Sequence, residues 1–107
     1  MVTAISTGRD VREAPVIDFA ATLDAAVTRN DSLVCVGLDP DQARIPPSAW
    51  DPGDVAGSLV RFNAAIIEAT ADLVCAYKPN LGFYLAFGLD GLAALVTTRR
   101  LVPAGIP

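Results

Sequence analysis

The chain has 107 residues, a formal net charge of −4, and 52% hydrophobic residues. This acidity argues against a nucleic-acid partner, because no basic stripe is present to displace counterions from phosphates. No apolar run reaches the roughly 18 residues of a membrane span, and the N-terminus lacks the apolar core of a secretory signal. The length fits one domain or a piece of one. A hydrophobic fraction this high in so short a chain predicts that part of the surface is covered by further protein.

The cysteine and histidine content bears on metals and on the compartment. Two cysteines and no histidine are present, which leaves little from which to build a metal site, so we expect no metal. Free thiols in a chain without a secretory signal predict a reducing, cytoplasmic location.

The first part of the chain divides into a tail and a helix. Residues 1–15 mix polar and charged residues without a sustained period, and we expect a flexible N-terminal tail there. Residues 16–107 are then one α/β unit. Residues 16–30 show a helical period. The apolar stripe of this helix is Phe19, Leu23, Ala26 and Val27.

A first strand is predicted over Ser32 to Leu38, a short apolar run rich in valine. Such continuous runs are typical of strands covered on both faces. Alternation places Cys35 and Gly37 on the same face as Asp39, which follows the strand directly. The sequence Asp39-Pro40-Asp41 then ends the strand with ordinary turn chemistry.

A strong helix is predicted over residues 54–70, after a loop rich in proline. Asp54 is placed to cap its N-terminus. Apolar residues recur in this helix at spacings of four and three, which predicts a single inward stripe. The stripe is Val55, Leu59, Phe62, Ile66 and Ala69.

The second strand is predicted over Leu73 to Lys78, and Pro79 ends it because proline has no amide hydrogen. Lys78 is the only lysine of the chain. An ammonium at the end of a buried strand is costly unless an anion meets it. The alternative interpretation of Lys78 is that its side chain extends from the strand end into solvent, with its aliphatic stem covering apolar surface.

Two further helices and a final extended segment complete the pattern. Residues 81–88 predict a short aromatic helix closed by Gly88, followed by a helix from residue 89 or 90 to about residue 100. Leu92, Leu95 and Val96 are expected to face inward in that second helix. Residues 102–107 are expected to lead into another strand.

Strands separated by a helix pair in parallel and form right-handed βαβ units. Two strands cannot close a sheet, so the sequence predicts the N-terminal part of a (β/α)₈ barrel of roughly 250 residues, truncated before its third strand. An open doubly wound sheet is the alternative. In a barrel the functional groups sit at the carboxyl ends of strands. Asp39 and Lys78 both occupy such positions, and we expect them to meet at one edge of the sheet.

The two cysteines follow identical Leu-Val pairs in the two predicted strands. Alternation puts Cys35 on the face of Asp39, while Cys75 lies opposite to Lys78. If Asp39 and Lys78 point the same way, the two sulfurs point to different sides of the sheet. We therefore predict two buried free thiols rather than a disulfide.

Several stretches together resemble the orotidine 5′-phosphate decarboxylase family, in its longer bacterial subgroup common among actinobacteria. The resemblance covers roughly residues 19–107, with the family's order and about its spacing. It is carried by Val36-Gly37-Leu38-Asp39-Pro40, Phe62-Asn63, Ile66-Ile67, Ala69-Thr70, Asp72 to Asn80, Phe83-Tyr84 and Gly88.

The resemblance implies a lyase without a cofactor that converts orotidine 5′-monophosphate to uridine 5′-monophosphate and carbon dioxide in de novo pyrimidine synthesis. By position, Asp39 would hydrogen-bond the ribose. Lys78 would reach the ribose as well and belong to a catalytic network of alternating charges. The family also implies a homodimer for the full-length protein, with active sites at the subunit interface.

One departure from the family is large. The family's third strand carries an Asp-x-Lys-x-x-Asp signature, whose lysine protonates the carbanion, and nothing in this sequence matches it. The phosphate-binding loops of the late strands are missing too. We therefore expect the chain to be an amino-terminal fragment that is inactive alone. The alternatives are a non-catalytic α/β interaction module, and another phosphosugar-binding barrel enzyme.

Overall fold

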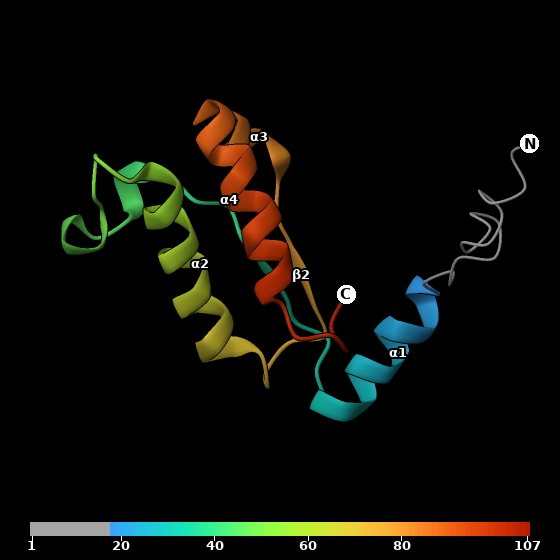
Figure 1. The fold of residues 1–107 in the computed structure, drawn as a ribbon. Helices are drawn as coiled ribbons and strands as arrows, with labels where there is room; N and C mark the ends of the chain where they lie inside the picture. Colours follow the sequence, from blue (N-terminus) through green and yellow to red (C-terminus); the bar gives the residue numbers. More distant parts are fainter. Residues whose placement is uncertain (1–17) are drawn as a thin grey trace, which may run out of the picture.

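A computed structural model describes residues 18–107 (Figure 1). The tail predicted over residues 1–15 lies outside the described residues. No helix in the described part of the chain is long and apolar enough to cross a membrane. The helices and strands are α1 (Phe19–Asn30), β1 (Cys35–Gly37), α2 (Val55–Thr70), β2 (Ala76–Lys78), α3 (Leu81–Leu85) and α4 (Gly88–Leu101), with short 3₁₀ turns η3 (Gln42–Arg44) and η4 (Pro47–Ala49).

β1 and β2 pair in parallel, as predicted, with Gly37 opposite Lys78. Both strands are three residues long, shorter than the predicted runs. Strand-like pairing continues beyond them, because the Leu38 N–H donates to the Lys78 carbonyl at 3.2 Å. On the other edge of β2, the Tyr77 N–H donates to the Pro107 carbonyl at 3.0 Å. The final residues thus approach β2 as a further strand would.

In the part of the chain from residue 18 onward, helices cover one face of this small sheet and leave the other open. The covered face belongs to a core formed by Leu38, Ile67, Val74, Tyr77, Val102 and Ile106. The opposite face is open: Cys35 and Gly37 are exposed. The prediction of coverage on both faces is therefore wrong for this chain, because α2 and α4 form a single helical layer. Cys75 is a buried free thiol as predicted, whereas Cys35 is free but exposed.

α1 begins at Phe19, where the Asp18 carboxylate accepts the Ala21 N–H at 3.1 Å. Its predicted apolar stripe is only partly covered: Ala26 is fully buried, but Phe19 is 61% exposed. The other end of α1 is well anchored, because the Asn30 side-chain amide donates to the carbonyls of Ala71 and Val74. These two bonds hold α1 beside the beginning of β2.

The buried face of α2 differs from the predicted one. Its buried residues are Ser58, Leu59, Asn63 and Ile67. Of the predicted stripe, Leu59 is buried, Phe62 and Ile66 are half-buried, and Ala69 is exposed. The predicted stripe is therefore only partly buried, and the buried face of α2 includes the polar residues Ser58 and Asn63.

The predicted cap of α2 is confirmed, because the Asp54 carboxylate accepts the Gly57 N–H at 2.9 Å. That hydrogen bond, together with Arg61 at 3.2 Å, lowers the pKa of Asp54 below its ordinary value of 3.8. A lowered pKa in the folded state means that this stabilisation is present above pH 4 and is lost as the pH falls through the folded pKa.

We expect Asp54→Asn to keep the cap, because asparagine caps as well as aspartate. The variant should nevertheless lose part of the acid dependence of unfolding. Urea melts of both proteins between pH 2.5 and pH 6 measure this. Equal slopes of stability against pH below pH 4 would contradict the assignment.

α3 and α4 both form, but α3 ends at Leu85, and Gly88, which was predicted to close α3, is the first residue of α4. α4 also buries a different set of residues from the predicted one. Val96 is 54% exposed, and the buried residues are Gly91, Ala94 and Thr98. The reason is close packing, because a Cβ atom on Gly91 would lie 1.8 Å from the Tyr84 carbonyl oxygen. Small residues thus let α4 approach α3 and α2, while Leu92 and Leu95, which were predicted to face inward, are half-buried.

We expect Gly91→Ala to destabilise the chain by about 1–3 kcal/mol, the usual range for overpacking a filled interior. The clash is with backbone, which cannot rotate away. Gly82→Ala is the matched control, because its Cβ would meet only the Asn80 side chain at 3.4 Å, an ordinary contact. Chemical denaturation of both variants measures the difference, and equal midpoints would contradict the packing argument.

Candidate functional site

Asp39 lies just beyond the carboxyl end of β1 and is half-buried. Its Oδ1 accepts the Asn80 N–H at 2.9 Å, so the carboxylate bridges from the first strand to the residue that follows the second. Gly37 leaves room for this carboxylate, since a Cβ there would lie 3.2 Å from Asp39 Oδ2. The local sequence therefore fixes the carboxylate at the strand end without enclosing it.

Lys78 is the last residue of β2, and its side chain is exposed. Two features fix the backbone of Lys78. Its carbonyl accepts a hydrogen bond from the Leu38 N–H across the sheet, and Pro79 ends the strand directly after it. The pairing of Gly37 with Lys78 places Lys78 on the same face of the sheet as Asp39. That face is the open one.

Asp39 and Lys78 lie at the same edge of the sheet, as predicted, but their side chains are not in contact. The two residues share an edge and a face, yet within residues 18–107 their side chains form no ion pair within 4.0 Å. The nearer partner of Asp39 is the backbone of Asn80. An exposed ammonium beside an open carboxylate leaves both groups available to a polar ligand.

Asn80 serves as a helix cap. Its Oδ1 accepts the Gly82 N–H at 3.0 Å at the start of α3. Because its own N–H is bonded to Asp39, the start of α3 is coupled to the end of β1. The sequence indicated the cap but not this backbone contact.

A buried polar network lies directly behind the site. The fully buried Tyr84 hydroxyl donates to the Leu38 carbonyl at 2.6 Å and accepts from the Asn63 side-chain amide at 3.1 Å. The same amide nitrogen donates to the Thr98 hydroxyl at 3.0 Å. Three helices thus converge on the residue that precedes Asp39. No role is assigned to Asn63 from the sequence, although an asparagine within an apolar helix can indicate a buried hydrogen bond.

The electrostatics of Tyr84 reflect this position. Burial raises the pKa of the phenol, and the negative charge of Asp39 raises it further, while the hydrogen bond from Asn63 acts in the opposite direction. Among the residues that the structure describes, the buried side-chain oxygen of Asn63 has no hydrogen-bond partner. The network is therefore neutral at physiological pH and holds the strand end through hydrogen bonds rather than charge.

Metal ligation has no counterpart in residues 18–107, where no cluster of three or more histidine, cysteine, aspartate or glutamate side chains could hold an ion. The arrangement offers one carboxylate, that of Asp39, and one ammonium, that of Lys78, at neighbouring strand ends. Adjacent strands are ~4.8 Å apart, so such a pair can orient the hydroxyl groups of a sugar.

No protein-family model matches the chain. Individual proteins do match it. The orotidine 5′-phosphate decarboxylase of Thermomicrobium roseum is 56% identical over 91 residues, which are 85% of this chain and 31% of that protein. The protein of the same name from Herpetosiphon aurantiacus is 54% identical over 89 residues, or 83% of this chain and 32% of that protein.

The fold agrees with these matches. A solved structure of the Leishmania donovani OMP decarboxylase superposes with a TM-score of 0.65 at 38% identity, over 83% of this chain and 30% of that one. The predicted fold class, an incomplete (β/α)₈ barrel, is thereby confirmed. The chain spans about a third of the length of the curated relatives it matches. It is a homologue of the orotidine 5′-phosphate decarboxylases over that third of their length.

Proposed function

We propose that the chain is the amino-terminal part of an orotidine 5′-phosphate decarboxylase. This carboxy-lyase converts orotidine 5′-monophosphate to uridine 5′-monophosphate and carbon dioxide, without a cofactor, in de novo pyrimidine synthesis. The observation that carries the proposal is the position of Asp39 and Lys78. They lie at neighbouring strand ends, on one open face, in a chain 56% identical to a protein of that name.

In this proposal Asp39 accepts hydrogen bonds from the ribose hydroxyls of the substrate, and Lys78 donates to the ribose and takes part in a charged network. Both strand ends are fixed by backbone hydrogen bonds before a ligand arrives. Groups that need no reorganisation can stabilise charge as it develops in the transition state, which is the main electrostatic contribution to catalysis. The proposed network stabilises the transition state more than it stabilises the substrate's carboxylate in the ground state, and only this difference accelerates the reaction.

The chain supplies only part of such a site. No Asp-x-Lys-x-x-Asp sequence occurs in its 107 residues, so the group that would protonate the carbanion after loss of carbon dioxide must come from elsewhere. Lys78 does not replace it, because the family uses both lysines. The chain alone is therefore inactive in this proposal.

A chimera tests the proposal directly. The 91 matched residues of the Thermomicrobium roseum relative are replaced by the corresponding residues of this chain. We expect the chimera to form uridine 5′-monophosphate and the purified 107-residue chain to form none above background. Turnover by the chain alone, or a folded chimera without turnover, would contradict the proposal.

Two finer points belong to the same proposal: a cytoplasmic location and a homodimer for the complete protein. A non-catalytic interaction module remains the second candidate, favoured by exposed apolar residues such as Leu33, 85% exposed, and Leu89, 83% exposed. A monodisperse chain with a cooperative melt would support the module. A broad or aggregating melt would count against it, because one edge of the small sheet has no partner strand among residues 18–107.

A further inference from the structure

Leu38 is the residue between β1 and Asp39, and it is fully buried. Its N–H donates to the Lys78 carbonyl at 3.2 Å, which continues the parallel hydrogen bonding past the end of β1. Its carbonyl accepts a hydrogen bond from the Tyr84 hydroxyl at 2.6 Å. The Leu38 carbonyl and the Asp39 N–H belong to one planar peptide unit. The Tyr84 hydroxyl therefore fixes the plane from which the Asp39 side chain projects.

The hydrogen bonding between the strands changes partners at this peptide unit. In a parallel pair, a residue that donates to one residue of the neighbouring strand accepts from the residue two positions further along that strand. Because Leu38 donates to Lys78, the regular donor to the Leu38 carbonyl would be the N–H of Asn80. The Asn80 N–H instead donates to Asp39 Oδ1 at 2.9 Å. Tyr84 thus occupies the acceptor that would otherwise compete with Asp39 for this N–H.

The direction of the hydrogen bond from Tyr84 to Leu38 is set by Asn63. The Asn63 side-chain nitrogen donates to the Tyr84 hydroxyl at 3.1 Å and to the Thr98 hydroxyl at 3.0 Å. An amide nitrogen only donates, so the single hydroxyl proton of Tyr84 is left for the Leu38 carbonyl. Asn63, Tyr84 and Thr98 are each at most 1% exposed. Bulk water therefore does not compete for these hydrogen bonds.

We propose that Tyr84 is a positioning residue for decarboxylation: its hydroxyl satisfies the Leu38 carbonyl and so reserves the Asn80 N–H for the carboxylate of Asp39. The effect on catalysis rests on the proposed function. A buried carbonyl without a partner is unfavourable, so without the hydroxyl the Leu38 carbonyl draws the Asn80 N–H away and releases the Asp39 carboxylate. Asp39 is then no longer held where it meets the ribose, and a misplacement of about 1 Å can lower a rate by roughly 10²-fold.

Tyr84→Phe in the chimera with the Thermomicrobium roseum relative tests the proposal by structure and by rate. In crystal structures of the chimera and this variant, we expect the Asn80 nitrogen to move from Asp39 Oδ1 to within hydrogen-bond distance of the Leu38 carbonyl. In steady-state assays, kcat/KM for orotidine 5′-monophosphate should fall at least about tenfold. In a chimera that carries Asp39→Ala, Tyr84→Phe should change kcat/KM by less than about twofold, because no carboxylate is left to position.

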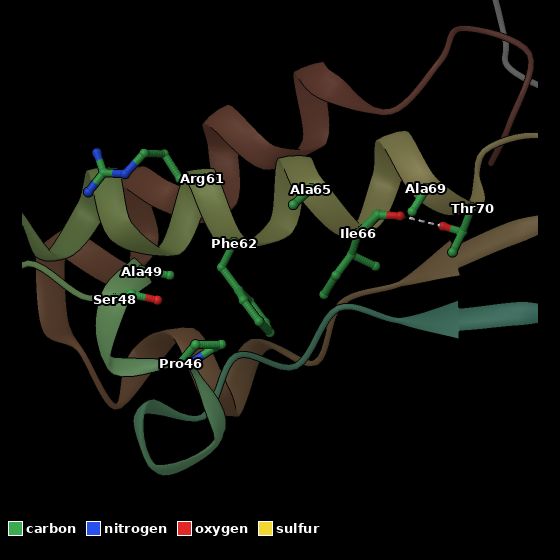
Figure 2. Close-up of a pocket in the computed structure, with 9 residues that line it drawn as sticks. All are labelled: Pro46, Ser48, Ala49, Arg61, Phe62, Ala65, Ile66, Ala69 and Thr70. Carbon is green, nitrogen blue, oxygen red and sulfur yellow. Dashed lines mark hydrogen bonds between the residues drawn. The ribbon is translucent and has the colours of Figure 1, made fainter.

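Tyr77→Phe is the matched control, because it removes a second buried tyrosine hydroxyl that does not contact the peptide unit before Asp39. The Tyr77 hydroxyl lies 2.7 Å from the Thr70 hydroxyl and 3.3 Å from the Ile67 carbonyl. Figure 2 shows Thr70 at the end of α2, where its hydroxyl donates to the Ile66 carbonyl. The control should lose a comparable amount of stability in urea melts and keep kcat/KM within about twofold of the parent chimera.

Three results would overturn the proposal: an Asn80 N–H that still bonds to Asp39 in the Tyr84→Phe structure, a loss of kcat/KM no larger than that of Tyr77→Phe, or fully additive losses from Tyr84→Phe and Asp39→Ala. If Tyr84→Phe does not fold, Asn63→Leu carries the same tests, since it keeps the hydroxyl but removes the amide that directs its proton. The crystallographic result does not depend on turnover. A folded but inactive chimera in which the Asn80 N–H changes acceptor would therefore refute the proposed function and leave the positioning of Asp39 by Tyr84 standing.

Discussion

Lys78→Met in the decarboxylase chimera is expected to lower kcat/KM at least a hundredfold. Methionine keeps the apolar stem of the side chain but removes the ammonium. Removing one preorganised group from a charged site typically lowers the rate by about 10²–10³. Because Lys78 is exposed and its backbone carbonyl carries the structural bond to Leu38, stability should change little. Steady-state assays of uridine 5′-monophosphate formation, with thermal melts, separate the two effects.

Asp39→Asn is the companion variant at the other strand end. Asparagine keeps an oxygen that can accept the Asn80 N–H, so the variant removes the charge while retaining the contact. We expect a loss of similar size in kcat/KM. Asp72→Asn and Arg100→Met, which neutralise exposed charges elsewhere in the chain, should leave it within about twofold. Full activity in both site variants would refute the proposed roles.

Tyr84→Ala is expected to lower the free energy of unfolding by about 3–5 kcal/mol, the usual cost of removing a large buried aromatic side chain. Single domains are commonly stable by only about 5–15 kcal/mol, so this variant approaches the limit of folding. Tyr84→Phe isolates the hydroxyl. It leaves the Leu38 carbonyl without its 2.6 Å partner and should lower stability by about 1–3 kcal/mol.

Leu85→Ala is the control on the same helix, since Leu85 is exposed and should change stability by less than about 1 kcal/mol. Urea denaturation of the three variants gives the ranking. Equal stability of Tyr84→Phe and the parent would mean that the network carries no net stabilisation.

The same network predicts an alkaline effect. The pKa of Tyr84 is raised in the folded state by burial and by Asp39. A raised pKa means that this contribution is fully present below the ordinary value of 10 and is lost as the pH rises through the folded pKa. Stability should therefore fall above pH 10, and Tyr84→Phe should reduce that fall. Melts between pH 8 and pH 11 measure the difference.

The sequence by itself determined the order of the elements and the edge of the sheet at which Asp39 and Lys78 lie. The βαβ pattern requires parallel strands, and the carboxyl ends of parallel strands share one edge. Asp39 and Lys78 follow or close their strands, so their placement depends on local pattern alone. The caps at Asp54 and Asn80 were predictable for the same reason, since a cap acts within a few residues of its own helix.

Only the tertiary structure decided which face of each helix is buried. α2 has apolar residues on two faces, and periodicity cannot tell which face a neighbour will cover; here α4 and the sheet take the face of Asn63 and Ile67. In α4 the small residues Gly91 and Ala94 are buried, whereas Val96, which periodicity predicts to face inward, is exposed. The hydroxyl of Tyr84 likewise meets Leu38 across 46 positions of sequence, a distance that local patterns do not span. Burial depends on which surfaces come together, so it is decided only when the chain is packed.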